Sequence, residues 1–339
     1  MDIKPYRNSI SESLKEIKCY QDKTKLLINT GYDFLDGLTP GSIVTFAGAS
    51  FTGKTILLEE VKSNIMSHQL NSKAGNFVWL SNSLEMTNLM TTLRGLSFKL
   101  GKSKKEIMLS DFSEEEKKLV VDYVKAVSDD RFYLNEEPMT GDEFLENIKD
   151  FCTKFKEKDL IVVDFDHVAL AKGSDKKKVM DSIFEHQNYL KKAFPNTLFF
   201  NVSQFNRDSL SRVADKSEDM RPRRNDLYQS DSLFQVSDVV ACLSTPYKLG
   251  VDNYRLVNPS YYDYLEEHFG DFNKSGSKVS FKTFGRIFIE VLKNRFGESL
   301  SAKDLFIKVI EEDSFTINSA PKNSVPQSNL FQDTLRMLD

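Results

Sequence analysis

The segment SIVTFAGASFTGKT, residues 42–55, decides the fold of this 339-residue chain. An apolar, β-forming run leads into the pattern G-x-x-x-x-G-K-T, and helical periodicity follows it over 54–70. A strand that turns through a Gly-rich loop into a helix presents backbone N–H groups and the positive helix end to a phosphate. In this pattern the lysine reaches the β- and γ-phosphates, and the hydroxyl after it binds Mg²⁺. The predicted ATP-binding residues are Gly48, Ser50, Thr52, Gly53, Lys54 and Thr55.

Apolar, β-rich runs alternate with helical periodicity from residue 42 to residue 311. Strands separated by helices of this length need crossover connections, which give a mostly parallel sheet flanked by helices. The last two strands have less helix between them, which favours an antiparallel edge. The sequence therefore predicts an α/β fold. Strands are expected at 43–47, 77–80, 132–134, 160–163, 197–202, 239–243, 287–292 and 305–310, and helices at 54–70, 87–99, 114–127, 141–157 and 178–194.

The chain divides into an arm, one large domain and a tail. In the arm, residues 1–25, Ser9 and Glu12 have capping-box spacing, and Ile10, Leu14 and Ile17 share one helical face. That apolar face can pack on its own domain or on a neighbouring subunit. Residues 26–313 form the expected nucleotide-binding domain, which is interrupted at 245–285 by a polar and aromatic surface excursion. Residues 314–339 turn polar and are expected to be a flexible tail.

Composition excludes several classes of protein. With 46 Lys+Arg against 50 Asp+Glu, the net charge of −4 argues against coating nucleic acid by bulk charge. A hydrophobic content of 40% excludes a wholly disordered chain. No run approaches the roughly 20 apolar residues of a membrane helix, and no secretory signal is visible. Cys19, Cys152 and Cys242 are too widely separated for a disulfide framework or a zinc site, so a cytoplasmic protein is expected.

Three polar residues follow apolar strands where a triphosphate site needs them. Asp164 ends the run Leu160–Val163, and on a strand neighbouring the phosphate loop it would help to hold Mg²⁺. Glu85 follows the strand that begins at Phe77 and, if that strand is also adjacent, can activate the attacking water. Gln204 follows the strand 198–202 and can sense the γ-phosphate. Each residue alone is more typical of a cap or a solvated surface, and only the combination predicts a catalytic site.

Further motifs follow in order between residues 28 and 312. They are TG-Y-x-x-LD at 30–36, SLEM at 83–86, VDF at 163–165, SQFNR at 203–207, RP…DL…SDVV at 221–240 and KNR at 293–295. Together they resemble the RecA-like ATPase domain of DnaB-type replicative helicases. The corresponding family motifs are TG-F-x-x-LD, SLEM, I-D-Y, SQLNR, RP…DL…ADVV and KQR.

The resemblance implies a role for each motif. Asp164 would hold the metal shell, Glu85 would be the general base, and Gln204 would be the γ-phosphate sensor. Lys293 and Arg295 would reach into a neighbour's site and neutralise charge on the transferred phosphoryl group. Hydrolysis would then require a ring, expected to be a homo-hexamer. Without that resemblance, Lys293 and Arg295 are more typical of a solvated edge strand.

The chain departs from the family in three places. The resemblance does not extend to the family's large N-terminal helical domain, so we expect a minimal form of the helicase such as a phage might encode. His167 stands where the family has Gln and is expected to be a satisfied structural histidine. The family's DNA loop DLRESGS appears as DLYQSDS at 226–232, which puts Tyr228 in place of Arg and Asp231 in place of Gly. Asp231 would repel a DNA phosphate, whereas Tyr228 could stack on a base.

Positive charge gathers in the segment 172–224, which holds 12 basic and 7 acidic residues. In a ring whose loops face inward, such a segment would track single-stranded DNA through its phosphates. A solvated surface is the ordinary alternative for a charged run. The residues predicted to contact DNA are Lys176, Lys177, Lys178, Arg207, Arg212, Arg223, Arg224 and Tyr228.

In the tail, Gln327–Phe331 resembles the Q-x-x-L-F peptide by which bacterial replication proteins dock on the sliding clamp. The function that these observations favour is an ATP-dependent replicative DNA helicase, with a primase or a loader as further partners. Two alternatives stay open: a RecA-fold ATPase of recombination or helicase loading that binds DNA without unwinding it, and a regulatory ATPase that does not bind DNA.

Overall fold

The computed structural model describes residues 6–22, 28–35, 37–71, 76–128, 130–206, 209, 220–228, 231–257, 272–276, 278–296, 305–310 and 317–319. The main-sheet strands are β1 Ile43–Gly48, β2 Phe77–Asn82, β3 Phe132–Asn135, β4 Leu160–Phe165, β5 Thr197–Gln204, β6 Val239–Ser244, β10 Arg286–Asn294, β11 Leu305–Ile310 and β12 Ile317–Ser319. The helices are α1 Tyr6–Gln21, α2 Lys54–Asn71, α3 Asn88–Leu100, α4 Lys104–Leu109, α5 Glu114–Val127, α6 Gly141–Lys154, α7 Lys176–Ala193 and α9 Asp231–Val236.

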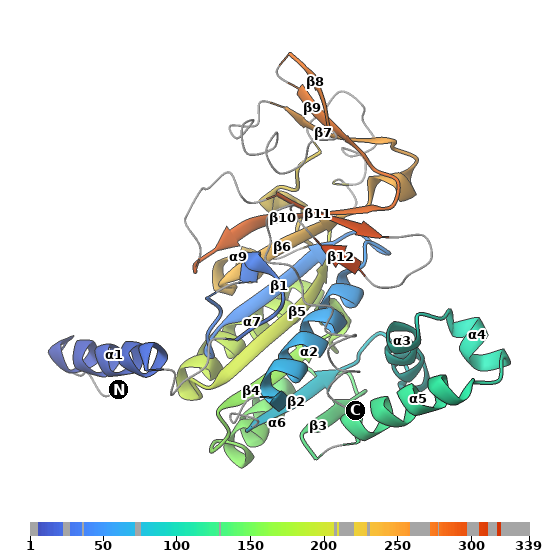
Figure 1. Cartoon of the computed structure of the whole chain (residues 1–339). Helices are drawn as coiled ribbons and strands as arrows, with labels where there is room; N and C mark the ends of the chain where they lie inside the picture. The colour runs from blue at the N-terminus through green and yellow to red at the C-terminus, as the bar shows by residue number, and fades with distance from the viewer. Residues whose placement is uncertain are drawn as a thin grey trace.

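The nine-stranded sheet has the order β12-β11-β10-β6-β1-β5-β4-β2-β3 (Figure 1). Strands β3, β2, β4, β5, β1 and β6 pair in parallel, and β10, β11 and β12 extend the sheet antiparallel. The predicted α/β fold with an antiparallel edge is therefore confirmed.

Helices cover both faces of the sheet because its central strands carry apolar side chains on both sides. On one face, α2 packs Leu57, Val61 and Ile65 against the strands. On the other face, α6 and α7 contribute Phe144 and Phe184 to a second core. This arrangement places the start of α2, and with it the phosphate loop, at the carboxyl edge of the parallel strands.

The order of the strands corrects one prediction. The strand of Asp164 was expected beside the phosphate-loop strand, but β5 lies between β1 and β4. The strand that precedes Glu85, β2, lies one position farther away, beyond β4. A crossover helix can carry the next strand past an intervening position, and hydrophobic patterns do not record that step. Of the three strands that carry these polar residues, β5, which ends at Gln204, is the one that pairs directly with β1.

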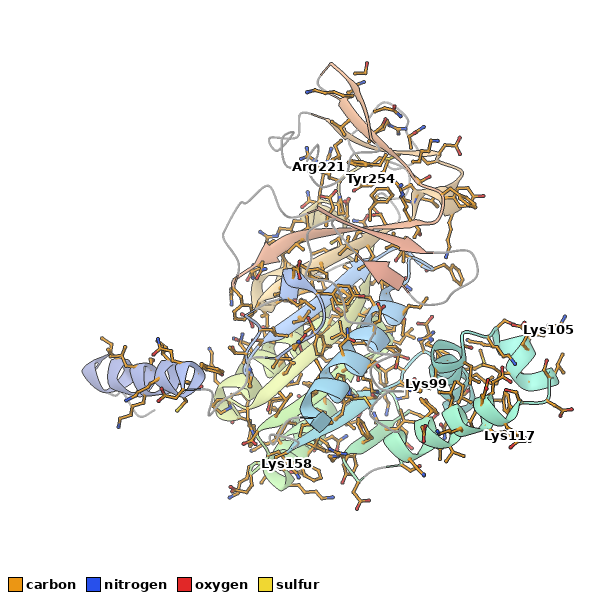
Figure 2. The ribbon with its side chains drawn as sticks, viewed as in Figure 1. Lys99, Lys105, Lys117, Lys158, Arg221 and Tyr254 are labelled. Carbon is orange, nitrogen blue, oxygen red and sulfur yellow. The ribbon has the colours of Figure 1, made fainter. Side chains whose placement is uncertain are left out.

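The described residues of the segment 245–285 form regular structure, which differs from the expected surface excursion. It begins with the 3₁₀ turn η4, Pro246–Leu249, and forms the strands β7 Asn253–Val257, β8 Phe272–Ser275 and β9 Lys278–Lys282. These pair antiparallel in the order β7-β9-β8. Tyr254 stacks on Phe288 of β10 with a ring separation of 4.1 Å, at the junction of the two sheets (Figure 2). Tyr254 and Phe281 of this insertion therefore form a buried contact with Phe288 of the main sheet.

The two ends of the chain also differ from expectation. Helix α1 begins at Tyr6, three residues before Ser9, so Ser9 lies inside the helix and does not cap it. The helix projects away from the sheet (Figure 1), and Ile10, Leu14 and Ile17 are exposed. In the predicted tail, residues 317–319 form β12 on β11. The rest of that tail, including the clamp-like peptide, lies outside the described residues.

Candidate functional site

The phosphate loop occupies residues 48–55 between β1 and α2. Gly48 cannot be replaced cheaply, because a Cβ there would lie 2.4 Å from the carbonyl oxygen of Leu243. Gly53 has a φ of 89°, in the region that favours glycine. Phe51 also has a positive φ, 63°, although it is a bulky residue with 83% of its surface exposed. Backbone strain at such a position is typical of a functional loop.

Lys54 closes the loop on itself. Its Nζ donates hydrogen bonds to the carbonyl oxygens of Gly48 at 2.9 Å and Ala49 at 2.6 Å. Burial lowers the pKa of Lys54 to about 8, and the nearby Glu85 carboxylate partly opposes that shift. An anionic ligand would favour the charged ammonium, so a triphosphate is a better partner than the carbonyls.

Glu85 and His167 lie near Lys54, and Asp166 lies beside Glu85. Burial raises the pKa of Asp166, and repulsion from Glu85 adds to that rise. Burial lowers the pKa of His167. The Glu85 carboxylate opposes that shift, and the Lys54 ammonium adds to it. The predicted loop lysine and the predicted general base are thus close enough to interact. His167 is buried, and among the described residues its Nδ1 has no hydrogen-bond partner, which differs from the expectation of a satisfied histidine.

Asp164 lies deeper than these residues. Its register partners are Phe200 on β5 and Ser81 on β2, and its carboxylate is only 4% exposed. Ser81 Oγ donates to Asp164 Oδ2 at 2.7 Å, and the indole N–H of Trp79 donates to the same oxygen. Burial raises the pKa of Asp164 to about 6, which the ammonium of Lys62 partly offsets. Burial therefore makes the ionised form of Asp164 less favourable than it is in water.

Gln204 connects the phosphate loop to the loop of Tyr228. In the β1–β5 register Gln204 is the partner of Gly48, and the next N–H, of Phe205, donates to the Gly48 carbonyl at 3.3 Å. The Gln204 carbonyl accepts the N–H of Tyr228 at 3.0 Å. A continuous backbone path therefore joins Gly48, Gln204 and Tyr228.

Lys293 and Arg295 both contact the end of α9. Lys293 Nζ donates to the carbonyls of Phe234 at 2.6 Å and Gln235 at 2.9 Å. Arg295 pairs with Asp238 at 2.7 Å, and about half of its side chain is exposed. Burial lowers the pKa of Lys293 to about 8, and the charge of Arg295 adds to that effect. In this single chain the two residues satisfy the carboxyl end of a short helix.

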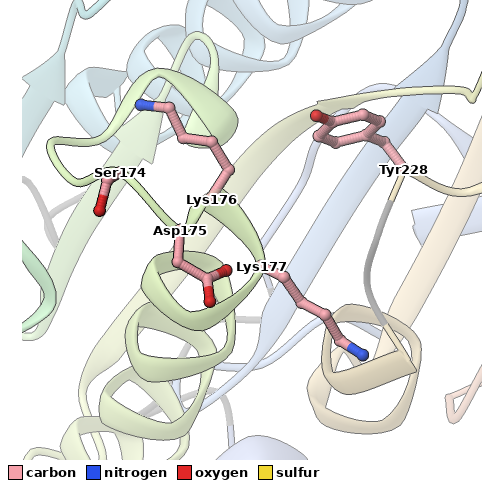
Figure 3. Close-up of a pocket in the computed structure, with 5 residues that line it drawn as sticks. All are labelled: Ser174, Asp175, Lys176, Lys177 and Tyr228. Carbon is pink, nitrogen blue, oxygen red and sulfur yellow. The ribbon is translucent and has the colours of Figure 1, made fainter.

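Two lysines of the basic segment, Lys176 and Lys177, lie near Tyr228 (Figure 3). Ser174, Asp175, Lys176, Lys177 and Tyr228 line a pocket of about 450 Å³ (Figure 3). Lys178 pairs with Asp175 at the start of α7.

Asp231, which was expected to repel a DNA phosphate, has a basic partner, because its Oδ1 lies 3.0 Å from Arg224 Nη2. Arg223 lies beside Arg224, with its N–H bonded to Asp226, and Arg207 and Arg212 fall outside the described residues.

No group of three or more His, Cys, Asp or Glu residues that could hold a metal ion occurs among the described residues. Mg²⁺ usually binds through one or two carboxylates, water and substrate phosphates, so its site need not contain such a group. Of the described helices, none is long and apolar enough to cross a membrane.

A family model described as the DnaB-like helicase C terminal domain matches residues 28–307. The chain belongs to this family. As a DnaB-like chain it is a helicase-type ATP hydrolase, which implies nucleotide binding. No curated protein matches the sequence.

Two solved structures resemble this DnaB-like fold. "ATPase Domain of G40P" has a TM-score of 0.67 and 16% identity, over 94% of this chain and 100% of that one. "The Structure Of A DnaB-Like Replicative Helicase And Its Interactions With Primase" has a TM-score of 0.61 and 16% identity. That match covers 92% of this chain and 66% of the other. At such identity the likeness concerns the fold alone.

Sequence reasoning missed Asp166, Trp79 and Ser81. Asp166 could have been found, because a residue two positions after Asp164 in an extended segment returns to the same face. Trp79 and Ser81 follow the same alternation on β2, but their contact with Asp164 requires the β2–β4 register, which only the structure supplies.

Proposed function

We propose that this DnaB-like chain is a replicative DNA helicase that forms a homo-hexameric ring and moves along single-stranded DNA as it hydrolyses ATP. The observation that carries the proposal is the backbone path from Gly48 through Gln204 to Tyr228. Loss of the γ-phosphate at one end would move a loop that can hold DNA at the other. Such a device fits a motor better than a simple hydrolase.

In this proposal each residue of the ATP site has one task. Lys54 exchanges its two carbonyl partners for the β- and γ-phosphates, and the backbone N–H groups of the loop bind the same oxygens. Thr55 and Asp164 hold Mg²⁺, which when bound neutralises phosphate charge. Glu85 accepts a proton from the attacking water, and Gln204 donates a hydrogen bond to the γ-phosphate.

DNA binding is assigned to the pocket beside Tyr228. The tyrosine ring offers a stacking surface for a base, and Lys176 and Lys177 supply positive charge for the backbone. Lys178, Arg207, Arg212, Arg223 and Arg224 belong to the same basic segment and are proposed to extend the contact. Because Arg224 already pairs with Asp231, we expect Arg224 to contribute less than the lysines.

Ring formation would use both the arm and the residues at α9. The exposed face formed by Ile10, Leu14 and Ile17 needs an apolar partner, and a neighbouring subunit can supply one. Lys293 and Arg295 would give up their contacts at α9 to reach the neighbour's triphosphate. A primase or a loader, and a sliding clamp bound through Gln327–Phe331, are proposed as partners in the cytoplasm.

Two assays test this proposal. ATP hydrolysis is expected to rise several-fold with single-stranded DNA and to disappear in Lys54→Ala. Hydrolysis that ignores DNA would favour the regulatory ATPase, and stimulation without strand separation would favour the recombination or loading ATPase.

For the ring, Arg295→Ala subunits mixed into wild type should reduce activity by more than their share of the mixture. A strictly proportional decline would contradict action across an interface. Lys192→Ala, a change on the surface of α7, serves as the matched control for loss of one positive charge.

A further inference from the structure

Asp166 occupies a position between the sheet and the loop of Glu85. It directly follows β4, and its N–H donates to the carbonyl of Asn82 at 3.2 Å, which extends the β2–β4 ladder by one step. The residue is only 7% exposed. Its backbone is therefore fixed by the sheet, whereas its side chain lies beyond the end of the strand.

The Asp166 carboxylate accepts hydrogen bonds from three consecutive residues. Oδ1 accepts the N–H of Leu84 at 2.8 Å and that of Glu85 at 3.3 Å, and Oδ2 accepts the hydroxyl of Ser83 at 3.0 Å. Charge-assisted bonds of this kind are about twice as strong as neutral ones. One carboxylate thus holds the whole segment that carries the predicted general base.

The same segment is held from its other side by β3. The N–H of Ser83 donates to the carbonyl of Asn135 at 2.8 Å, and Asn135 Nδ2 donates to Asn82 Oδ1 at 3.1 Å. These bonds constrain the backbone at Glu85 and leave its exposed carboxylate outside the network. The segment is consequently rigid where the base is attached.

We propose that Asp166 is a positioning residue for ATP hydrolysis, which acts by holding the backbone of Glu85 so that its carboxylate reaches the attacking water. The inference rests on the proposed role of Glu85. A general base works only within about 2.6–3.2 Å of the proton that it accepts. A displacement of about 1 Å can cost about 100-fold in rate. Asp166 itself neither binds the nucleotide nor exchanges the proton.

The test compares kcat and KM for ATP in Asp166→Ala, Asp166→Asn and Ser83→Ala. Asp166→Ala should lower kcat by about 10- to 100-fold with less than a twofold change in KM, because only the base is misplaced. Asp166→Asn keeps one acceptor for the Leu84 N–H and should recover part of the rate. Ser83→Ala removes one of the bonds and should cost the least. Glu290→Gln, which neutralises another buried carboxylate far from the loop, is the control and should leave kcat unchanged.

A double variant separates positioning from general damage. If Asp166 acts only through Glu85, then Asp166→Ala in a Glu85→Ala background should cause no further loss. An additional tenfold loss there would overturn the inference, as would an unchanged kcat in Asp166→Ala. A raised Mg²⁺ requirement in Asp166→Ala would instead make Asp166 a metal ligand. If Glu85→Ala retains full activity, the proposed role of Glu85 fails first, so the two failures are distinguishable.

Discussion

Asp164 should destabilise the folded protein at neutral pH, and Asp164→Asn should relieve that cost. Burial raises its pKa from 3.8 to about 6, a rise of about two units, although the hydrogen bonds from Trp79 and Ser81 oppose that rise. At about 1.4 kcal/mol per unit, the ionised carboxylate costs about 3 kcal/mol of folding free energy. A carboxyl whose pKa is higher in the folded state stabilises that state when protonated, so the cost is small near pH 4. It grows as pH rises through 4 to 6 and is complete above about pH 7.

Urea unfolding in EDTA, without nucleotide, measures this effect directly. The gain in free energy of unfolding from Asp164→Asn should rise from little at pH 4 to about 3 kcal/mol at pH 7.5. Asp159→Asn, at an exposed aspartate, should show no such trend. The same Asp164→Asn protein should lose ATP hydrolysis, because it lacks the proposed metal-shell carboxylate. A gain in free energy of unfolding that does not change with pH would show that the pKa of Asp164 is not raised in the folded protein.

Three further predictions concern other parts of the molecule. Tyr228→Ala should weaken binding of single-stranded DNA by about 10-fold in a fluorescence titration, because about 1.4 kcal/mol, within the roughly 1–3 kcal/mol of one stacked base, is lost. Tyr189→Ala, at an exposed tyrosine on α7, should not weaken binding, and equal effects would contradict the assignment. Phe51→Gly should raise the free energy of unfolding, measured in urea, by about 1 kcal/mol, because glycine adopts the positive φ at this exposed position without strain. A lower free energy of unfolding in this variant would contradict the prediction. Gln187→Leu should cost about 2–3 kcal/mol, because the buried amide of Asn201 loses both of its bonds to Gln187, at 2.8 and 2.9 Å; a neutral change by the same measurement would count against it.

The sequence predicted the sheet well where patterns were strong. The run that begins at Leu160 is apolar through Val163, and Thr45 is the one polar residue in the run that begins at Ile43; each run became a strand buried on both faces. The helix α4 escaped notice, although Ser103 and Glu106 form a capping box that could have revealed it. The strands of the insertion were not predicted because their few apolar residues stand in a mostly polar segment. Those residues, such as Tyr254 and Phe281, are nevertheless buried.

For the site, motifs predicted which residues matter but not how they are arranged. The pattern at Gly48–Thr55 depends only on local geometry, so the phosphate loop could be located from sequence. The contacts of Asp164 with β2, and of Asp166 with the segment that follows β2, depend on the register between β2 and β4, which no local pattern encodes. Likewise, the contacts of Arg295 with Asp238 join residues 57 positions apart in the chain.

The most direct test of the account is strand separation on a forked DNA duplex. With ATP and Mg²⁺ the full chain should release the labelled strand, and Lys54→Ala should release none under the same conditions. Glu290→Gln should match the wild-type rate, because its buried carboxylate lies outside the nucleotide and DNA sites. ATP hydrolysis by the wild-type protein without release of the strand, at any protein concentration that forms rings, would contradict the helicase assignment.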